Sequence, residues 1–253
     1  MDTLVVDHLD RSGVSGKHPA GPLFEEAFRT LRASLLVRVQ GTPSVMITSA
    51  RPGEGKSTIA ANLAWSLAFS GQVALVDADF RRPCQHELFR LPNELGFADV
   101  LAGRARLDRC FQRVTSSLTV VTGGSKPRDL IELLDRARFD AALDALRADF
   151  NFVLVDSPPV LAVADAMVIG ACVSGVRLVL KWGEVTESEA LLARRRLESS
   201  GSTLIGCVVN QFPGTDDGDY HPYVKEYAET SVHGQPGAVR PDTELGPLLK
   251  ASC

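Results

Sequence analysis

A nine-residue segment, ARPGEGKST at positions 50–58, limits the folds open to this chain more than any other feature. It follows the apolar run SVMITS (44–49) and opens the helix-like stretch STIAANLAWSLAFS (57–70). The segment has a small residue, four residues of any type, and then Gly-Lys-Ser, a pattern that needs a strand before it and a helix after it. Backbone N–H groups of such a loop and of the helix N-terminus cradle phosphate oxygens. The sequence therefore predicts a nucleotide-binding loop between a strand and a helix.

Each position of this loop has a chemical role in the prediction. Gly53 and Gly55 let the backbone approach the phosphates, and the ammonium of Lys56 reaches the β- and γ-phosphates. The hydroxyl of Ser57 is expected to bind the Mg²⁺ that accompanies them. The expected ATP contacts in the loop are Gly53, Glu54, Gly55, Lys56, Ser57 and Thr58. A chance match is the alternative, and the flanking strand and helix argue against it.

Short apolar runs alternate with helix-like stretches through most of the chain. Apolar residues recur at helical spacing in 24–40, and 57–70 and 136–149 are also helix-like. Short, nearly continuous apolar runs are typical of parallel strands that are covered on both faces. These runs are 44–49, 73–77, 118–122, 152–156, 176–180 and 204–209. The alternation predicts one α/β domain with a doubly wound, mostly parallel sheet.

The two ends of the chain lack this pattern. Residues 1–22 are rich in Gly, Ser, Pro and His, and we predict a flexible N-terminal arm there. Residues 212–253 carry repeated Pro and Gly, so we predict a flexible C-terminal tail. The nucleotide-binding domain is then expected over 23–211. All the tyrosines of the chain lie in the predicted tail, as Tyr220, Tyr223 and Tyr227.

Composition excludes several classes of protein. The chain has 27 basic and 31 acidic residues, a net charge of −4, which argues against nucleic acid as a partner. It has no apolar run of eighteen residues that could span a membrane, and its acidic N-terminus does not resemble a signal peptide. The five cysteines form no C-x-x-C pair, so neither a zinc nor an iron–sulfur site is indicated.

Acidic residues end two of the predicted strands. Asp77 closes VALVD and Asp156 closes FVLVD, while Asp79 follows Asp77 by two residues. Ligands of open α/β sheets bind at the carboxyl ends of the strands, so these carboxylates should converge near the loop. A nucleotide-bound Mg²⁺ needs such a carboxylate. An N-cap of the next helix is the alternative role for either strand-end aspartate alone.

Together these segments resemble the bacterial tyrosine kinases that control capsular and exopolysaccharide synthesis. That family is related to the MinD/ParA-like P-loop ATPases. The matching segments are PGEGKS (52–57), VDADFR (76–81), VDSPP (155–159), an E-x-x-R-x-x-R pattern at Glu26, Arg29 and Arg32, and the tyrosine cluster. The resemblance covers about residues 24–227 and implies a P-loop NTPase fold that uses ATP and Mg²⁺.

The resemblance also implies a role for each matched residue. Lys56 and Ser57 would hold ATP and Mg²⁺, and Asp79 and Asp156 would position the metal ion together with Ser57. Asp77 would accept the proton of an incoming tyrosine hydroxyl, so the implied catalytic set is Lys56, Asp77 and Asp79. Asn210 matches the residue that contacts adenine in the wider ATPase class, although an Asn that closes a strand is also an ordinary turn residue.

The implied function is a protein-tyrosine autokinase that regulates polysaccharide synthesis and export. Glu26, Arg29 and Arg32 would join unphosphorylated subunits into a ring, in which one subunit modifies the tail tyrosines of its neighbour. A solvated charged stripe is the alternative for these three residues. The implied partners are a transmembrane polysaccharide co-polymerase adaptor and a cognate tyrosine phosphatase. The implied location is cytoplasmic, at the membrane through the adaptor, and the chain could be free-standing or part of a fused protein.

Two rival functions belong to other classes. A MinD/ParA-like ATPase switch would share the fold without kinase activity. Such proteins usually have Lys at the second loop position, which is Arg51 here, and the predicted tail lacks a basic amphipathic helix for a membrane. A small-molecule kinase or synthetase is the second rival, and in it the clustered tyrosines would have no role.

Overall fold

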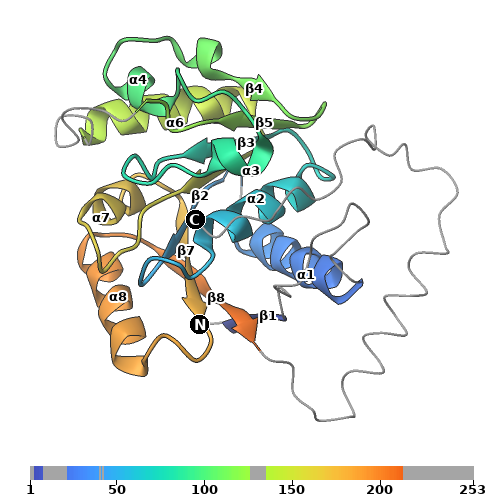
Figure 1. Cartoon of the computed structure of the whole chain (residues 1–253), viewed down its shortest axis with the longest axis vertical. Helices are drawn as coiled ribbons and strands as arrows, with labels where there is room; N and C mark the ends of the chain where they lie inside the picture. Colours follow the sequence, from blue (N-terminus) through green and yellow to red (C-terminus); the bar gives the residue numbers. More distant parts are fainter. Residues whose placement is uncertain (1–2, 8–21, 40, 42, 126–134, 213–253) are drawn as a thin grey trace, which may run out of the picture.

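A twisted, eight-stranded sheet organises the computed structural model of the chain (Figure 1). The structure describes residues 3–7, 22–39, 41, 43–125 and 135–212. The strand order is β1-β8-β7-β2-β6-β3-β5-β4, and every neighbouring pair is parallel except β4–β5. The strands are β1 (Thr3–Asp7), β2 (Ser44–Ser49), β3 (Val73–Asp77), β4 (Gln112–Arg113), β5 (Leu118–Val121), β6 (Phe152–Asp156), β7 (Gly175–Lys181) and β8 (Leu204–Phe212).

Helices cover both faces of the sheet. The helices are α1 (Pro22–Arg38), α2 (Lys56–Leu67), α3 (Gln85–Phe89), α4 (Phe97–Leu101), α6 (Arg136–Asp149), α7 (Asp165–Gly170), α8 (Glu187–Ser199) and the 3₁₀ helix η1 (Leu107–Cys110). One apolar cluster joins the strands to α1, α2 and α3, and a second joins them to α4, α6, α7 and α8. Figure 1 shows α1 and α2 on one side and α7 and α8 on the other.

Side chains of single strands alternate between these two clusters. In β2, Val45 and Ile47 pack on the side of α1 and α2, whereas Met46 packs on the opposite side. All three are at most 1% exposed. Strands that are buried on both faces need apolar residues at every position, which explains the continuous apolar runs of the sequence. The doubly wound α/β fold predicted from these runs is confirmed.

The N-terminal arm is the part of the domain prediction that needs correction. We assigned residues 1–22 to a flexible arm, but residues 3–7 form β1 and pair in parallel with β8, and Pro22 begins α1. TLVVD is too short to show a strand period, and its pairing depends on β8, which is far away in the sequence. At the other boundary, β8 continues to Phe212, one residue into the predicted tail. The tyrosine cluster lies outside the described residues.

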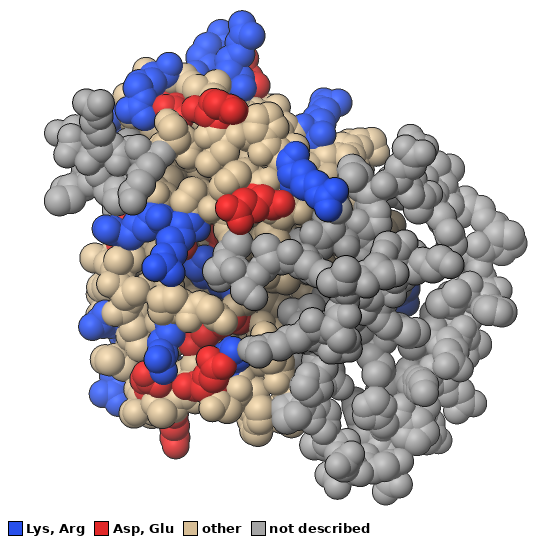
Figure 2. All heavy atoms as spheres, in the orientation of Figure 1, with Lys and Arg blue, Asp and Glu red and all other residues tan. Residues whose placement is uncertain are grey.

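Opposite charges lie side by side on the surface of the described part of the chain. Arg104 contacts Asp99 at 2.8 Å and Arg194 contacts Glu198 at 2.6 Å. Figure 2 shows basic and acidic side chains next to one another on the face in view. Surface charges in these places therefore compensate one another. Among the described residues, no helix combines the length and the apolar character that a membrane crossing requires.

Candidate active site

The predicted site forms at the carboxyl ends of three adjacent strands. β6 lies between β2 and β3, so the loop that follows β2 is beside the ends of both other strands. Asp77 and Asp156 are opposite each other in the β3–β6 register, and Asp156 is opposite Ile47 of β2. The predicted convergence of the strand-end aspartates on the loop is therefore present in the structure.

The backbone of the loop is shaped to receive an anion. Gly53 and Gly55 have φ angles of 83° and 85°, the left-handed region that favours glycine. Gly55 is also the N-cap of α2, and no side chain caps that helix end. The first N–H groups of α2 therefore lack a partner from a capping side chain, and an anion could fill that place.

Asn210 packs against this loop at Glu54 and Gly55. A Cβ added to Gly55 would lie 2.3 Å from Nδ2 of Asn210, so only glycine fits there. Asn210 is fully buried at the end region of β8, and its Nδ2 donates to the carbonyl oxygen of Glu54 at 2.9 Å. The structure thus brings Asn210 to the phosphate loop, and its expected contact with adenine stays a prediction.

Glu54 closes the loop on itself. Its side chain is buried, and its Oε2 accepts a hydrogen bond from the backbone N–H of Ala50 at 2.9 Å. Burial raises the pKa of Glu54 to about 7, although backbone N–H groups of Arg51 and Ala50 oppose the shift. Because the carboxylate is directed into the loop, any contact of Glu54 with ATP would come from its backbone.

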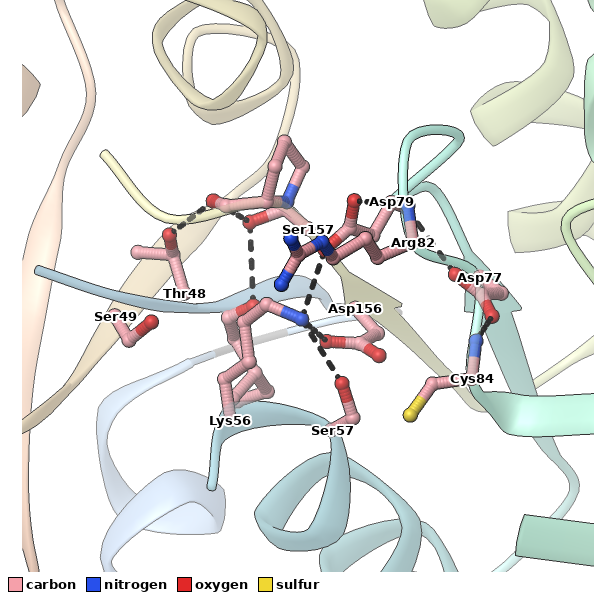
Figure 3. A network of polar contacts seen from close by, with 12 residues as sticks. Thr48, Ser49, Lys56, Ser57, Asp77, Asp79, Arg82, Cys84, Asp156 and Ser157 are labelled. Carbon is pink, nitrogen blue, oxygen red and sulfur yellow. Dashed lines mark hydrogen bonds and ion pairs between the residues drawn. The ribbon is translucent and has the colours of Figure 1, made fainter. Parts of the chain in front are cut away.

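Lys56 is the centre of a compact ionic cluster (Figure 3). Its Nζ lies 2.9 Å from Oδ2 of Asp79 and 3.7 Å from Oδ1 of Asp156, and it donates to Oγ of Ser57 at 3.0 Å. The side chain of Lys56 is 12% exposed, and those of Asp79 and Asp156 are 4% and 0% exposed. One ammonium therefore compensates two buried carboxylates, and a third, Asp77, is close by.

Burial and mutual charge shift the protonation of this cluster. Burial by itself lowers the pKa of Lys56, but the carboxylates of Asp156 and Asp79 raise it more, so the ammonium stays charged. Burial raises the pKa of Asp156, while Lys56 acts in the opposite direction. The cluster has three carboxyl groups, those of Asp77, Asp79 and Asp156, to one ammonium, and carboxylate oxygens are ligands that suit a divalent cation.

Asp77 is held by the backbone that follows it. Its Oδ1 accepts from the N–H of Asp79 at 3.1 Å, and its Oδ2 accepts from the N–H groups of Cys84 and Gln85 at 2.8 and 2.9 Å. Burial, and then the charge of Asp156, raise the pKa of Asp77 to about 7. The residue lies where a proton acceptor was expected, and that role stays a prediction.

Two further contacts at the site were absent from the sequence prediction. Gln85, the first residue of α3, donates from Nε2 to the carbonyl oxygen of Ser57 and to Oδ2 of Asp156. Arg81 forms two hydrogen bonds to Asp165, at 2.8 and 3.2 Å, and so joins the segment after β3 to the start of α7. No local pattern in the sequence marks Gln85 or Asp165, because their partners come from segments that are distant in the sequence.

The residues present fit ATP and Mg²⁺. Oδ1 of Asp156 is buried and has no hydrogen-bond partner, although Lys56 is near, so it has room for a further ligand. A hydroxyl and carboxylates are the oxygen donors that Mg²⁺ uses together with phosphate oxygens. The described residues contain no group of three or more His, Cys, Asp or Glu that could hold a metal ion without such help. Ser57, Asp79 and Asp156 would hold the ion.

The predicted interface residues of α1 make contacts within the chain. Arg29 lies 3.4 Å from Glu26, and both side chains are about two-fifths exposed, at 43% and 42%. Arg32 donates to the carbonyl oxygen of Ser66, in the last turn of α2, at 2.9 Å. Arg29 pairs with Glu26 on the surface, whereas Arg32 contacts α2 of the same chain. The predicted role of these three residues in contacts between subunits stays a prediction.

Sequence comparison identifies the family. The chain is 38% identical over 192 residues to the tyrosine-protein kinase YwqD of Bacillus subtilis, which covers 74% of this chain and 81% of that protein. It belongs to the bacterial tyrosine-protein kinases. No family model matches the chain. This kinase-family chain is also 38% identical over 189 residues to the tyrosine-protein kinase Etk of Escherichia coli, where it spans only about a quarter of the protein, 26%.

Solved structures agree with this assignment. The kinase domain of the Escherichia coli tyrosine kinase Etk matches with a TM-score of 0.77 and 31% identity, over 86% of this chain and 92% of that chain. The septum site-determining protein MinD from Pyrococcus horikoshii, complexed with Mg-ADP, has a TM-score of 0.58 and 22% identity, over 74% and 76%. The second match shows a shared fold. The family and the P-loop NTPase fold predicted from the motifs are confirmed.

Proposed function

We propose that this bacterial tyrosine-protein kinase transfers the γ-phosphoryl group of ATP to tyrosine hydroxyls, with its own Tyr220, Tyr223 and Tyr227 among the acceptors. The observation that carries the proposal is the cluster of Lys56, Ser57 and the buried aspartates at the ends of β2, β3 and β6. The loop in front of α2 provides N–H groups for phosphates, and the aspartates provide ligands for a cation.

The chain's own residues then have separate tasks. Lys56 exchanges its aspartate partners for phosphate oxygens, and Ser57, Asp79 and Asp156 hold the cation. When bound, Mg²⁺ would neutralise negative charge that develops on the phosphates during transfer. Asp77 accepts the proton of the attacking tyrosine, whose pKa is about 10 when free and which therefore needs a base at neutral pH. Asn210 completes the nucleotide site.

The finer functional assignment extends this proposal to an assembly. Unphosphorylated subunits form a ring through α1, and one subunit modifies the tail of its neighbour. Phosphorylation adds about −1.5 to −2 charges per tyrosine, and the resulting repulsion between adjacent tails separates the subunits. A cognate phosphatase would reverse this step.

The physiological role would be the control of capsule or exopolysaccharide synthesis and export. A relative in Klebsiella pneumoniae, 34% identical over 189 residues, carries a name that places it in the cps region, which supports this role. In the proposal, a transmembrane co-polymerase adaptor recruits the kinase from the cytoplasm to the membrane.

Intact mass after incubation with Mg-ATP tests the activity. The kinase is expected to gain phosphate groups, and the gain is expected to vanish in Lys56→Met and in a Tyr→Phe variant of all three tail tyrosines. Light scattering on the same samples measures the particle mass, which should decrease as phosphate is added and subunits leave the ring. ATP hydrolysis with no gain in mass would instead identify a MinD-like switch. A phosphorylated protein of unchanged particle size would contradict the separation of subunits.

A further inference from the structure

Gln85 forms hydrogen bonds with residues of the three elements that make up the site, β3, β6 and α2. Its Nε2 donates to the carbonyl oxygen of Ser57 at 3.1 Å and to Oδ2 of Asp156 at 2.8 Å. Its backbone N–H donates to Oδ2 of Asp77 at 2.9 Å. Gln85 thus joins the end of β3 to the end of β6 and to the start of α2, and its side chain is fully buried.

The orientation of the Gln85 amide follows from these partners. Both groups near its side-chain nitrogen are acceptors, a carbonyl oxygen and a carboxylate oxygen. An amide NH₂ has two hydrogens, and here each has one acceptor. The flipped amide would place Oε1 against two oxygens, so the orientation is determined by chemistry. In this orientation Oε1 is buried and has no hydrogen-bond partner, which makes it a costly group to retain for packing alone.

The two hydrogen bonds of the Gln85 side chain act on expected metal ligands. One immobilises the carboxylate of Asp156 through Oδ2 and leaves Oδ1 without a hydrogen bond, 3.7 Å from Nζ of Lys56. The other holds the backbone of Ser57, whose hydroxyl would bind the same ion. Groups that orient metal ligands in this way are typically worth 10- to 100-fold in metal affinity.

We propose that Gln85 is a positioning residue that sets the Mg²⁺ affinity of this site by holding Ser57 and Asp156 in the geometry that the ion requires. The inference rests on the proposed function for the presence of Mg-nucleotide. The inference goes beyond the proposed function by assigning an effect on Mg²⁺ affinity to Gln85, which lies outside all five segments that match the family. Gln85 acts through Ser57 and Asp156, so it need not touch the ion or the nucleotide.

The test measures ADP binding by calorimetry, once with Mg²⁺ and once with EDTA. Gln85→Met keeps the length and approximate volume of the side chain and removes its hydrogen bonds. The matched control is Gln112→Met in β4, since Gln112 also donates from Nε2 to two acceptors, the carbonyl oxygen of Pro92 and Oγ1 of Thr122. Gln85→Asn is a second variant, with an amide that is too short to span both acceptors.

We expect both Gln85 variants to bind ADP as wild type does in EDTA, within about twofold, and to require roughly 10- to 100-fold more Mg²⁺ for half of the metal-dependent gain in affinity. Gln112→Met should behave as wild type in both conditions. An equal loss of ADP affinity with and without Mg²⁺, or no shift in the Mg²⁺ requirement, would overturn the inference. If Gln85→Met does not fold, Gln85→Asn decides by the same criteria.

The same inference can be separated from the kinase assignment. In one outcome the Gln85 variants show the expected higher Mg²⁺ requirement, but the wild-type protein gains no phosphate. That outcome would contradict the proposed function and leave the role of Gln85 intact. In the other outcome the wild type transfers phosphate, but Gln85→Met has no Mg²⁺-specific effect on ADP binding. That outcome would support the proposed function and contradict the role of Gln85.

Discussion

At the scale of single residues, the cluster around Lys56 shows how the site is stabilised before a nucleotide binds. Lys56 is the nearest cation to two buried carboxylates, Asp79 and Asp156. Buried charges without a partner are costly, so the same lysine that would bind phosphate also stabilises the fold. The proposed phosphate-binding role and the structural role of Lys56 would therefore coincide in one side chain.

This double role predicts that Lys56→Met is destabilising as well as inactive. Removing one partner of a buried ion pair typically costs about 3–5 kcal/mol, and the lost free energy of unfolding should be measurable by urea denaturation of the nucleotide-free protein. The control is Lys181→Met, because Lys181 is similarly buried but pairs with Glu184, which is 59% exposed. An exposed partner can be solvated, so this change should cost only about 1 kcal/mol or less. Equal losses in the two variants would contradict the explanation.

Glu54 gives a prediction about pH. Its pKa rises from 4.5 to about 7 in the folded chain, so folding favours the protonated form. The stability contributed by that form is fully present below pH 4.5 and is lost as pH rises to about 7. Glu54→Gln cannot ionise, so its stability should fall less than that of wild type across this range. The difference should be on the order of 2 kcal/mol, after allowance for partial solvation.

Thermal or urea unfolding at several pH values from 5 to about 8 checks this point. The quantity to compare is the change of stability with pH in each protein, since the amide alters hydrogen bonding at every pH. Parallel pH profiles for wild type and Glu54→Gln would contradict the raised pKa.

At the scale of elements, α1 combines surface charge with a contact that supports α2. The last carbonyl groups of a helix lack partners within the helix, and Arg32 provides one for Ser66. A cation near a helix C-terminus also interacts favourably with the helix dipole. Arg29, in contrast, is paired with Glu26 on an exposed surface.

This difference predicts that charge reversal at Arg32 and charge reversal at Arg29 have different effects on stability. Arg32→Glu should destabilise the single chain by about 1–2 kcal/mol, because a carboxylate would face the carbonyl end of α2. Arg29→Glu should leave unfolding nearly unchanged, within about 0.5 kcal/mol. If α1 joins subunits, Arg29→Glu alone should reduce particle mass in light scattering. An unchanged mass would contradict the subunit contact without the complication of lost stability.

Elements that could be predicted from the sequence are those determined by their own residues. The apolar run 152–156 is buried on both faces in β6, so the run and the strand coincide. β1 was missed because its strand conformation depends on β8 at the other end of the domain. The same distinction applies to the site. Asp77 and Asp156 follow from strand ends, whereas Gln85 depends on how the chain turns from Asp79 to Cys84, which no spacing shows.

At the scale of the whole molecule, the order of strands determines where an acceptor must arrive. The site is at the ends of β2, β6 and β3, whereas the chain leaves the sheet from β8, three positions from β6 in the strand order. Tyr220 follows Phe212 by eight residues, a length that can span at most about 29 Å when fully extended. Because Asn210 of β8 contacts Glu54 of the phosphate loop, this reach excludes neither transfer within a subunit nor transfer between subunits.

Mixing two variants, neither of which can phosphorylate its own tail, separates these routes. Lys56→Met should lack transfer activity but keep its tyrosines, and the triple Tyr→Phe variant should keep activity but lack tail acceptors. If transfer occurs between subunits, the mixture should place phosphate on the Lys56→Met chain, as intact mass would show, while neither variant alone gains tail phosphate. The rate per chain should also rise with concentration, because the step requires two molecules. Phosphate on wild type but none on Lys56→Met in the mixture would place the transfer within one chain.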